Sequence, residues 1–437
     1  MNLPKSKWKR FGIFTLACVL FFILTLIVFA CGGGGGGGGG GSSNPPGASA
    51  LTAVVQPLLL PGPYAVACSN VDQDFSRVGV GEDVTNYWEG MPSDNGMARY
   101  ATDLLADPGN TLIATVTAPQ DATLYGEFAG QAVEFVVLAC YPTTAGNPRP
   151  DYPLNPPQTD RVVPHMQTGS DAPLFADASV RYPVVAFSHG YMGSPISSDD
   201  YMLALSVCAS YGYVVIAPFH GDLRFSNLKI DKLEDVIYVA SHLDNFTAMQ
   251  ALRPLSISAA LTLVLEHPQW KDHIDATKIG GFGASMGGET MLLLGGAGLT
   301  TSYFDIGASW KQVTRDPRIK AAVGYVPYFG QPILPAFGRD QDGLNGINLP
   351  FLGISGTADT TAPIIEAEIG MSLLTGTRRL VALSGVTHGF DDASTNDIYT
   401  WMLTFLDAEV RGNPEAIHRL STMESVAGGG DDSVWLY

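Results

Sequence analysis

From residue 182 onward, short apolar runs alternate with longer stretches of helical character. Each run has the length and composition of a strand that is buried on both faces. The stretches between them, such as 198–211 and 245–266, have the length of core helices, and another helix is expected to start near Ser285. Strands that alternate with helices form βαβ units, so the pattern predicts a mostly parallel sheet. The predicted strands cover 183–188, 213–218, 278–282, 319–326, 350–355 and 378–383.

Residues 51–181 have a different pattern, rich in turn formers and short strand signals. Partly alternating, β-branched runs predict strands at 111–117 and 133–141. The Pro-rich and polar stretch 142–181 predicts a long surface connection. We therefore expect residues 51–181 to form a β-rich extension in front of an α/β core.

The α/β core is expected to cover residues 182–412, followed by a C-terminal tail at 413–437. An insertion-like stretch at 223–246 could form a lid or a wall of a substrate site. No internal repeat is apparent in the sequence.

The first 31 residues have the pattern of an export signal. Four basic residues among the first ten precede an uninterrupted apolar run at 11–30, and Cys31 follows. The stretch Val28-Phe29-Ala30-Cys31 resembles a bacterial lipobox, which implies lipidation of Cys31. An uncleaved membrane anchor is the alternative, because twenty apolar residues can span a bilayer. Both alternatives export the rest of the chain to the periplasm or the cell surface, held to a membrane through a Gly-rich linker at 32–50.

Composition narrows the class of protein further. Hydrophobic residues make up 46% of the 437 residues and charged residues 15%, which is enough apolar material for a sizeable core. The formal net charge of −18 repels nucleic acid, so we expect no nucleic-acid partner.

Cysteine usage fits export. Cys68 and Cys140 lie in strand-like segments and could pair in an oxidising compartment, while two unpaired buried thiols are the equal alternative. Cys208 lies in a helical stretch and is expected to be a small core residue.

A short motif supplies a candidate nucleophile. Gly283-Ala284-Ser285-Met286-Gly287 matches the pattern G-x-S-x-G, in which a sharp strand-to-helix turn exposes a serine hydroxyl. The flanking glycines allow the turn and the close packing that it forces. Here the motif follows a predicted strand and precedes a predicted helix, so we predict Ser285 as the nucleophile.

A serine hydroxyl is a weak nucleophile and needs a base that is oriented by a carboxylate. His388 follows the last predicted strand and is the best candidate base. Asp359, just after the strand ending at residue 355, is the expected acid. Asp391 and Asp392 are rival acids, but they follow His388 so closely that they are expected to begin a helix.

Two backbone N–H groups are needed to bind the oxyanion of a tetrahedral intermediate. We predict that Met286, the residue after the nucleophile, supplies one of them. Tyr191, in the loop after the strand ending at residue 188, is expected to supply the other. We interpret the side chain of His189 as structural support for that loop.

The sequence offers no convincing metal site. His220 and Asp222 follow the strand 213–218, but no further His or Cys cluster accompanies them, so we interpret them as residues that orient a loop. The segment 340–346 faintly resembles a calcium loop, although turn-forming composition explains it equally well. We therefore expect neither a metal nor an organic cofactor.

With these residues in hand, the chain from about 182 to 412 resembles bacterial polyesterase-lipase-cutinases and their platelet-activating-factor-acetylhydrolase-like and dienelactone-hydrolase-like relatives. The resemblance implies an α/β-hydrolase fold and a triad of Ser285, Asp359 and His388. It also implies that Tyr191 and Tyr328 form aromatic walls of the substrate site. The matching segments are Phe187-Ser188-His189-Gly190-Tyr191, Ser285-Met286-Gly287-Gly288, Asp359-Thr360-Thr361-Ala362-Pro363 and Thr387-His388-Gly389-Phe390.

This resemblance implies a carboxylic-ester hydrolase that acts on a small-molecule or polymeric ester through an acyl-enzyme. Ala284 departs from the family pattern, in which His is usual at that position, and leaves the nucleophile assignment intact. Amide hydrolysis or acyl transfer on the same triad, and an inactive surface-binding lipoprotein, are the alternatives.

Overall fold

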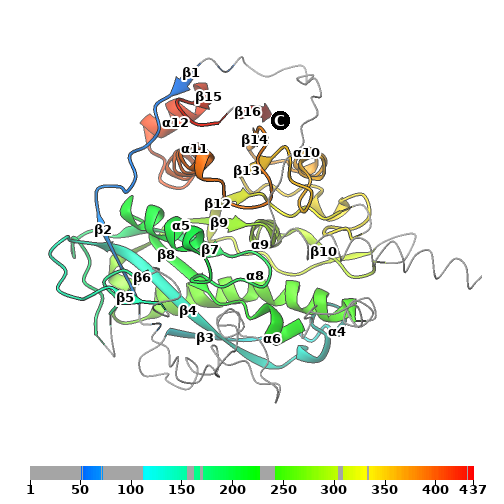
Figure 1. Ribbon diagram of the computed structural model, residues 1–437. Coiled ribbons are helices and arrows are strands. Elements are labelled where there is room, and N and C mark those ends of the chain that lie inside the picture. The colour runs from blue at the N-terminus through cyan, green and yellow to red at the C-terminus, as the bar shows by residue number, and fades with distance from the viewer. Residues whose placement is uncertain are drawn as a thin grey trace, which may run out of the picture.

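The computed structural model describes residues 51, 53–69, 71, 112–154, 162–167, 171–226, 242–303, 309–331, 334–430 and 432–437. One twisted ten-stranded sheet crosses the described part of the chain (Figure 1). Its strands follow the order β16-β14-β13-β12-β9-β7-β8-β4-β2, and β3 also pairs with β4. They are β2 (Ala65–Cys68), β3 (Leu112–Thr117), β4 (Ala132–Thr143), β7 (Tyr182–Ser188), β8 (Val214–Pro218), β9 (Ile274–Ala284), β12 (Ile319–Tyr325), β13 (Phe351–Gly356), β14 (Arg378–Leu383) and β16 (Asp432–Leu436).

The six strands from β8 to β14 run parallel and make up the middle of the sheet. Antiparallel strands complete both edges, with β4, β2 and β3 beyond β8 and with β16 beyond β14. The prediction of a mixed α/β architecture with a mostly parallel sheet is therefore confirmed. The strands that were expected from 183–188 to 378–383 all occur, and β9 starts four residues before the predicted 278.

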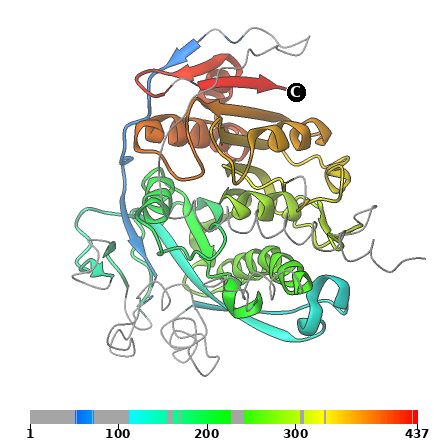
Figure 2. The ribbon, with the colours of Figure 1, turned by 45° about the vertical axis from the view of Figure 1, so that its right-hand side comes forward.

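Helices cover both faces of the sheet, as the two views show (Figures 1 and 2). Along β7, Val185 and Phe187 point into one hydrophobic layer, while Val184 and Ala186 point into the other. This two-residue alternation explains why the strand reads as a continuous apolar run. One layer contains α5 (Asp199–Ser210), α11 (Thr395–Glu409) and α12 (Pro414–Thr422), and the other contains α4 (Ala122–Tyr125), α6 (Asp222–Ser226), α8 (Leu243–Glu266), α9 (Met286–Leu294) and α10 (Ile364–Leu373).

Helix α8 is the long apolar helix of this second layer. In length and composition it could cross a membrane, and it is the single helix among the described residues of which this is true. Most of it is buried within the fold, where it packs on the sheet and contacts α9, so its apolar character is that of a core helix. Of the predicted lid at 223–246, residues 223–226 belong to α6 and 243–246 begin α8, and residues 227–241 lie outside the described residues.

The prediction of a C-terminal tail at 413–437 is wrong. These residues form α12, β15 (Met423–Val426) and β16. Strand β16 closes one edge of the main sheet against β14, and β15 pairs with β1 (Ala53–Val55) at the top of Figure 1. Both strands are short and their partners lie far away along the chain, so no local periodicity reveals them.

Three strands of the N-terminal region, β2, β3 and β4, extend the main sheet beyond β8. Within the expected surface connection 142–181, β5 (Tyr152–Pro153) pairs antiparallel with β6 (Val162–Val163). A further short pair, β10 (Gly298–Thr300) with β11 (Trp310–Gln312), lies between α9 and β12 in the chain. The predicted anchor and linker, residues 1–50, lie outside the described residues.

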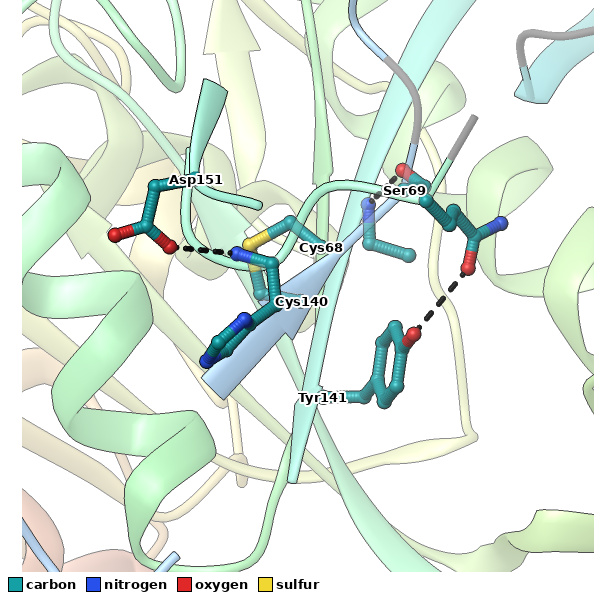
Figure 3. The surroundings of a disulfide bond; sticks show 8 residues. Cys68, Ser69, Cys140, Tyr141 and Asp151 are labelled. Atoms are coloured by element: carbon teal, nitrogen blue, oxygen red, sulfur yellow. Dashed lines mark hydrogen bonds between the residues drawn. A yellow bond between two sulfur atoms is a disulfide. The ribbon is translucent and has the colours of Figure 1, made fainter. Parts of the chain in front are cut away.

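A disulfide joins Cys68 to Cys140 and settles the alternative that the sequence leaves open (Figure 3). The two residues face each other in the antiparallel ladder of β2 and β4. Next to them, the Ser69 hydroxyl accepts a hydrogen bond of 2.9 Å from the N–H of Ala139. Cys208 is a buried free thiol in α5, as predicted. The disulfide therefore fastens the edge strand β2 to the sheet.

Removal of the disulfide should destabilise the fold. Its two cysteines are 72 residues apart in the chain, and the closure of such a loop is expected to contribute about 2–4 kcal/mol by restricting the unfolded state. The double substitution Cys68→Ser/Cys140→Ser should lower the free energy of unfolding in urea by that amount. A reducing agent should lower it in the natural protein and leave the variant unchanged; an equal response of both proteins would contradict the prediction.

Candidate active site

Ser285 lies at the sharp turn between β9 and α9. Its backbone has φ 54° and ψ −119°, a conformation that residues other than glycine rarely adopt. Such strained conformations persist only where the surroundings enforce them. The N–H of Ser285 donates to the carbonyl of Tyr325 at 2.9 Å, and its own carbonyl accepts from the N–H of Tyr328 at 3.0 Å. Both contacts come from the segment at the end of β12, so the neighbouring strand holds the turn in place.

The glycines of the motif are required by close packing. A Cβ atom on Gly283 would lie 2.1 Å from the carbonyl oxygen of Gly287, and one on Gly287 would lie 1.9 Å from the carbonyl oxygen of Ser188. At Gly288 a Cβ would meet Cβ of Pro327 at 2.5 Å. None of these glycines has a positive φ, whereas Ser285 does. Glycine is therefore needed here for space and not for backbone conformation. The motif thus brings the first turn of α9 against the ends of β7 and β12.

The predicted base lies in hydrogen-bond contact with both the predicted nucleophile and the predicted acid. Nε2 of His388 lies 2.9 Å from Oγ of Ser285, and Nδ1 of His388 lies 2.8 Å from Oδ2 of Asp359. A carboxylate can only accept, so Nδ1 carries the proton and Nε2 is left to accept from the Ser285 hydroxyl. The structure therefore joins the three residues in one chain of hydrogen bonds.

Asp359 is held more firmly than its contact with His388 alone would require. Its second oxygen, Oδ1, accepts hydrogen bonds of 2.8 Å from the N–H groups of Thr361 and Ala362. The Asp359 side chain is fully buried, while that of His388 is 30% exposed. Of the rival acids, Asp391 caps a short helical turn through the N–H of Ser394 at 3.0 Å, as expected for a residue that begins a helix.

The sheet explains how residues so far apart in the sequence meet. Ser285 follows β9, Asp359 follows β13 and His388 follows β14, and these parallel strands end at the same edge. The loop that carries His388 is fixed by Tyr325, whose hydroxyl donates to the carbonyl of Gly389 at 2.7 Å. Loops at the carboxyl edge of an open parallel sheet are where ligands bind in such folds.

The two residues predicted to supply N–H groups come from the start of α9 and from the loop after β7. Met286 is the first residue of α9, so its N–H has no acceptor within the helix. Tyr191 follows Gly190, at which a Cβ would lie 3.5 Å from Cβ of Ser285. The Tyr191 ring packs edge-on against Phe246, with centroids 5.7 Å apart.

Of the remaining predicted site residues, Tyr328 is joined to Ser285 through its backbone N–H. The Tyr328 hydroxyl donates to the carbonyl of Leu334 at 3.2 Å. Cys31 lies outside the described residues.

His189 and His220 are buried side by side beneath the loop after β7. Each of their four ring nitrogens has a hydrogen-bond partner. The Nδ1 atom of His189 lies 2.8 Å from the carbonyl oxygen of Gly190, and its Nε2 accepts from the N–H of His220. His220 contacts the hydroxyls of Ser188 and Ser256 at 2.7 Å and 2.8 Å. Burial lowers the pKa of His189 to about 4 and that of His220 well below its usual value.

Both histidines are therefore neutral at pH 7, which fits the interpretation that they support the loop. Asp222 accepts from the N–H of Met192 at 2.9 Å in the same loop. Among the described residues, no group of three or more His, Cys, Asp or Glu side chains could hold a metal ion.

Two buried ionisable side chains near the site, those of Arg253 and Glu289, belong to no motif in the sequence. Arg253 on α8 forms an ion pair with Asp222, and Glu289 on α9 accepts a hydrogen bond of 2.6 Å from Gln250. The Gln250 amide oxygen in turn accepts from the Tyr303 hydroxyl at 3.0 Å. Burial raises the pKa of Glu289 to about 8. A charged residue amid an apolar helical run is the only signal in the sequence that could have drawn attention to either.

Comparison with known proteins adds no relative: no family model matches the chain, and no curated protein resembles it significantly. The assignment of a function therefore depends on the geometry of the site.

An alanine at Gly287 should destabilise the protein by about 1–3 kcal/mol, because its Cβ would overlap the Ser188 carbonyl and force α9 off the sheet. Gly146→Ala is the matched control, since its Cβ would have Thr144 Oγ1 as nearest neighbour at 3.9 Å. The control should change the free energy of unfolding in urea by less than about 1 kcal/mol. Equal effects of both substitutions would refute the packing argument.

In the natural protein, the free energy of unfolding should fall as the pH rises toward 8, and Glu289→Gln should abolish this fall. Because the pKa of Glu289 is raised from 4.5 to about 8, the folded protein keeps a proton that the unfolded chain has released. Its contribution to stability is complete below pH 4.5 and is lost as the pH rises through about 8, by up to roughly 1 kcal/mol per pH unit. His189 has its unfolded pKa near 6.5, so the window from pH 6.5 to 8 reports on Glu289.

Urea unfolding across that window should show stability falling with pH in the natural protein and a flatter profile in Glu289→Gln. Parallel profiles would show that Glu289 does not titrate there.

Proposed function

We propose that the chain is a serine carboxylic-ester hydrolase built on an α/β-hydrolase scaffold. The observation that carries the proposal is the hydrogen-bonded chain from Ser285 Oγ through His388 to Asp359, with distances of 2.9 Å and 2.8 Å. The strained turn at the half-buried Ser285 supports it, because a strained serine at a strand-to-helix turn is typical of a nucleophile elbow. The order of serine, acid and histidine along the chain agrees with that scaffold.

In the first step, Oγ of Ser285 attacks the ester carbonyl carbon while Nε2 of His388 takes the hydroxyl proton. The new carbon–oxygen bond turns the carbonyl oxygen into an oxyanion. Collapse of this intermediate breaks the bond to the alcohol, which leaves with the proton from His388, and an acyl-enzyme remains. Water then attacks the acyl-enzyme with His388 again as base, which releases the acid and restores Ser285.

Asp359 orients His388 and stabilises its protonated form, which exists only while the proton is in transit. The bonds from Thr361 and Ala362 keep the carboxylate ready for that task. The N–H groups of Tyr191 and Met286 are the proposed donors to the oxyanion, and donors aligned in advance cost no reorganisation during the reaction.

Tyr191 and Tyr328 are the proposed aromatic walls for a small-molecule or polymeric ester. Tyr328 is suited to this role because its backbone N–H donates a hydrogen bond to the carbonyl of Ser285. We further propose that the enzyme works outside the cytoplasm, held to a membrane through lipidated Cys31 or an uncleaved anchor. The disulfide between Cys68 and Cys140 supports this, since disulfides form in exported proteins.

Substitution of the nucleophile tests the proposal. Ser285→Ala should lower kcat on p-nitrophenyl butyrate by at least about 10⁴-fold, because no other group can form the acyl-enzyme. A fluorophosphonate probe should label the natural protein and leave Ser285→Ala unlabelled. Cys208→Ser is a control that removes a buried nucleophilic atom elsewhere and should keep activity and labelling. Full ester turnover by Ser285→Ala would refute the assignment.

A further inference from the structure

Arg253 is a charged residue in the core. Its side chain is 1% exposed, and so is that of Asp222, which it contacts through two parallel hydrogen bonds. Nε donates to Oδ1 at 2.8 Å and Nη2 donates to Oδ2 at 2.7 Å. A buried ion pair contributes little net stability, because removing both charges from water is costly. Its presence directly beneath the site therefore calls for a reason other than stability.

The remaining donors of the guanidinium reach the loop after β7. Nη1 donates to the carbonyl of His189 at 2.8 Å, and Nη2 donates to the carbonyl of Gly190 at 2.9 Å. From the same side, Asp222 accepts from the N–H of Met192. The ion pair thus holds peptide groups of residues 189–192 in a single orientation.

The orientation of a carbonyl decides the orientation of the N–H that follows it. A trans peptide is planar, so its C=O and N–H point in opposite directions. The rule is visible between His189 and Gly190, where Arg253 binds the carbonyl and the N–H donates away from it to the Tyr201 hydroxyl at 3.0 Å. In the next peptide, two donors converge on the Gly190 carbonyl, from Arg253 and from the His189 ring. The N–H of Tyr191 must therefore point away from Arg253.

We propose that Arg253, locked by Asp222, is a positioning residue that aims the Tyr191 N–H at the oxyanion formed on Ser285. The inference rests on the proposed ester hydrolysis and adds to it the group that builds half of the oxyanion hole. Arginine suits the task because its planar fork binds a carboxylate and two carbonyls at once, which a lysine ammonium cannot do. Since Arg253 acts through the peptide, its loss should affect the transition state more than substrate binding.

Arg253→Lys is the first test. It keeps the charge and removes the fork, and kcat on p-nitrophenyl butyrate should fall by about 10²-fold, with KM changed by less than about threefold. Arg318→Lys is the matched control. Arg318 also pairs with an aspartate, since its Nε and Nη2 donate to the carboxylate of Asp316, and it binds the Ser258 carbonyl on α8 rather than a carbonyl of the loop. This control should keep the natural kcat.

A second measurement separates positioning from a general structural role. A trifluoromethyl ketone adds to the serine and forms a tetrahedral oxyanion, so its inhibition constant should rise in Arg253→Lys by the same factor as kcat/KM falls. A fall in kcat without that rise would overturn the inference. So would a kcat equal to that of Arg318→Lys.

If Arg253→Lys does not fold, Asp222→Asn takes its place, because it keeps the volume and one acceptor oxygen while it loosens the lock. It should lower kcat about tenfold with the same parallel change in inhibition. Wild-type protein that neither hydrolyses esters nor reacts with a fluorophosphonate at Ser285 would overturn the proposed function and this inference together. An active, labelled enzyme that is indifferent to both substitutions would overturn the inference alone.

Discussion

The close approach of the first turn of α9 to the ends of β7 and β12 is the constraint on which the rest of the site depends. At Gly287 and Gly288 the backbone leaves no room for a side chain, so the helix begins in one position relative to the sheet. That position forces Ser285 into its strained turn, and the contacts from the end of β12 keep it there. Backbone packing of this kind resists deformation, since protein interiors are close-packed and have low compressibility.

Around this contact, the buried ionisable side chains are either ion-paired or electrically neutral. Arg253 is paired with Asp222, and His189 and His220 stay neutral because burial disfavours their protonated forms. Glu289 also keeps its proton at pH 7. The region beneath Ser285 thus carries fixed dipoles and little net charge, which would suit the stabilisation of the proposed oxyanion.

The antiparallel edges serve a different purpose. Edge strands expose unpaired backbone groups, and here the parallel centre is flanked by β4, β2 and β3 on one side and by β16 on the other. The disulfide between β2 and β4 ties the outermost of these strands to the sheet (Figure 3). Strands from both ends of the described chain therefore protect the parallel strands that carry the site.

Local chemistry in the sequence determined the alternation of strands and helices, the turn at Ser285, and the candidates His388 and Asp359 that follow later strands. Each of these depends on neighbouring residues, whose periodicity or turn chemistry is legible in one dimension. Each of the three side chains follows a parallel strand of the same sheet. Because these strands end at one edge, the structure brings the side chains into contact there.

Only the tertiary structure decided which distant residues meet. The pairing of Cys68 with Cys140 and of β16 with β14 depends on the order of strands in the sheet, which no local pattern encodes. The same holds for Arg253, an arginine within an apolar helix whose partner lies 31 residues earlier in the chain. The serine motif marks where the reaction would take place, but the peptide orientations that would stabilise its transition state come from contacts across the fold.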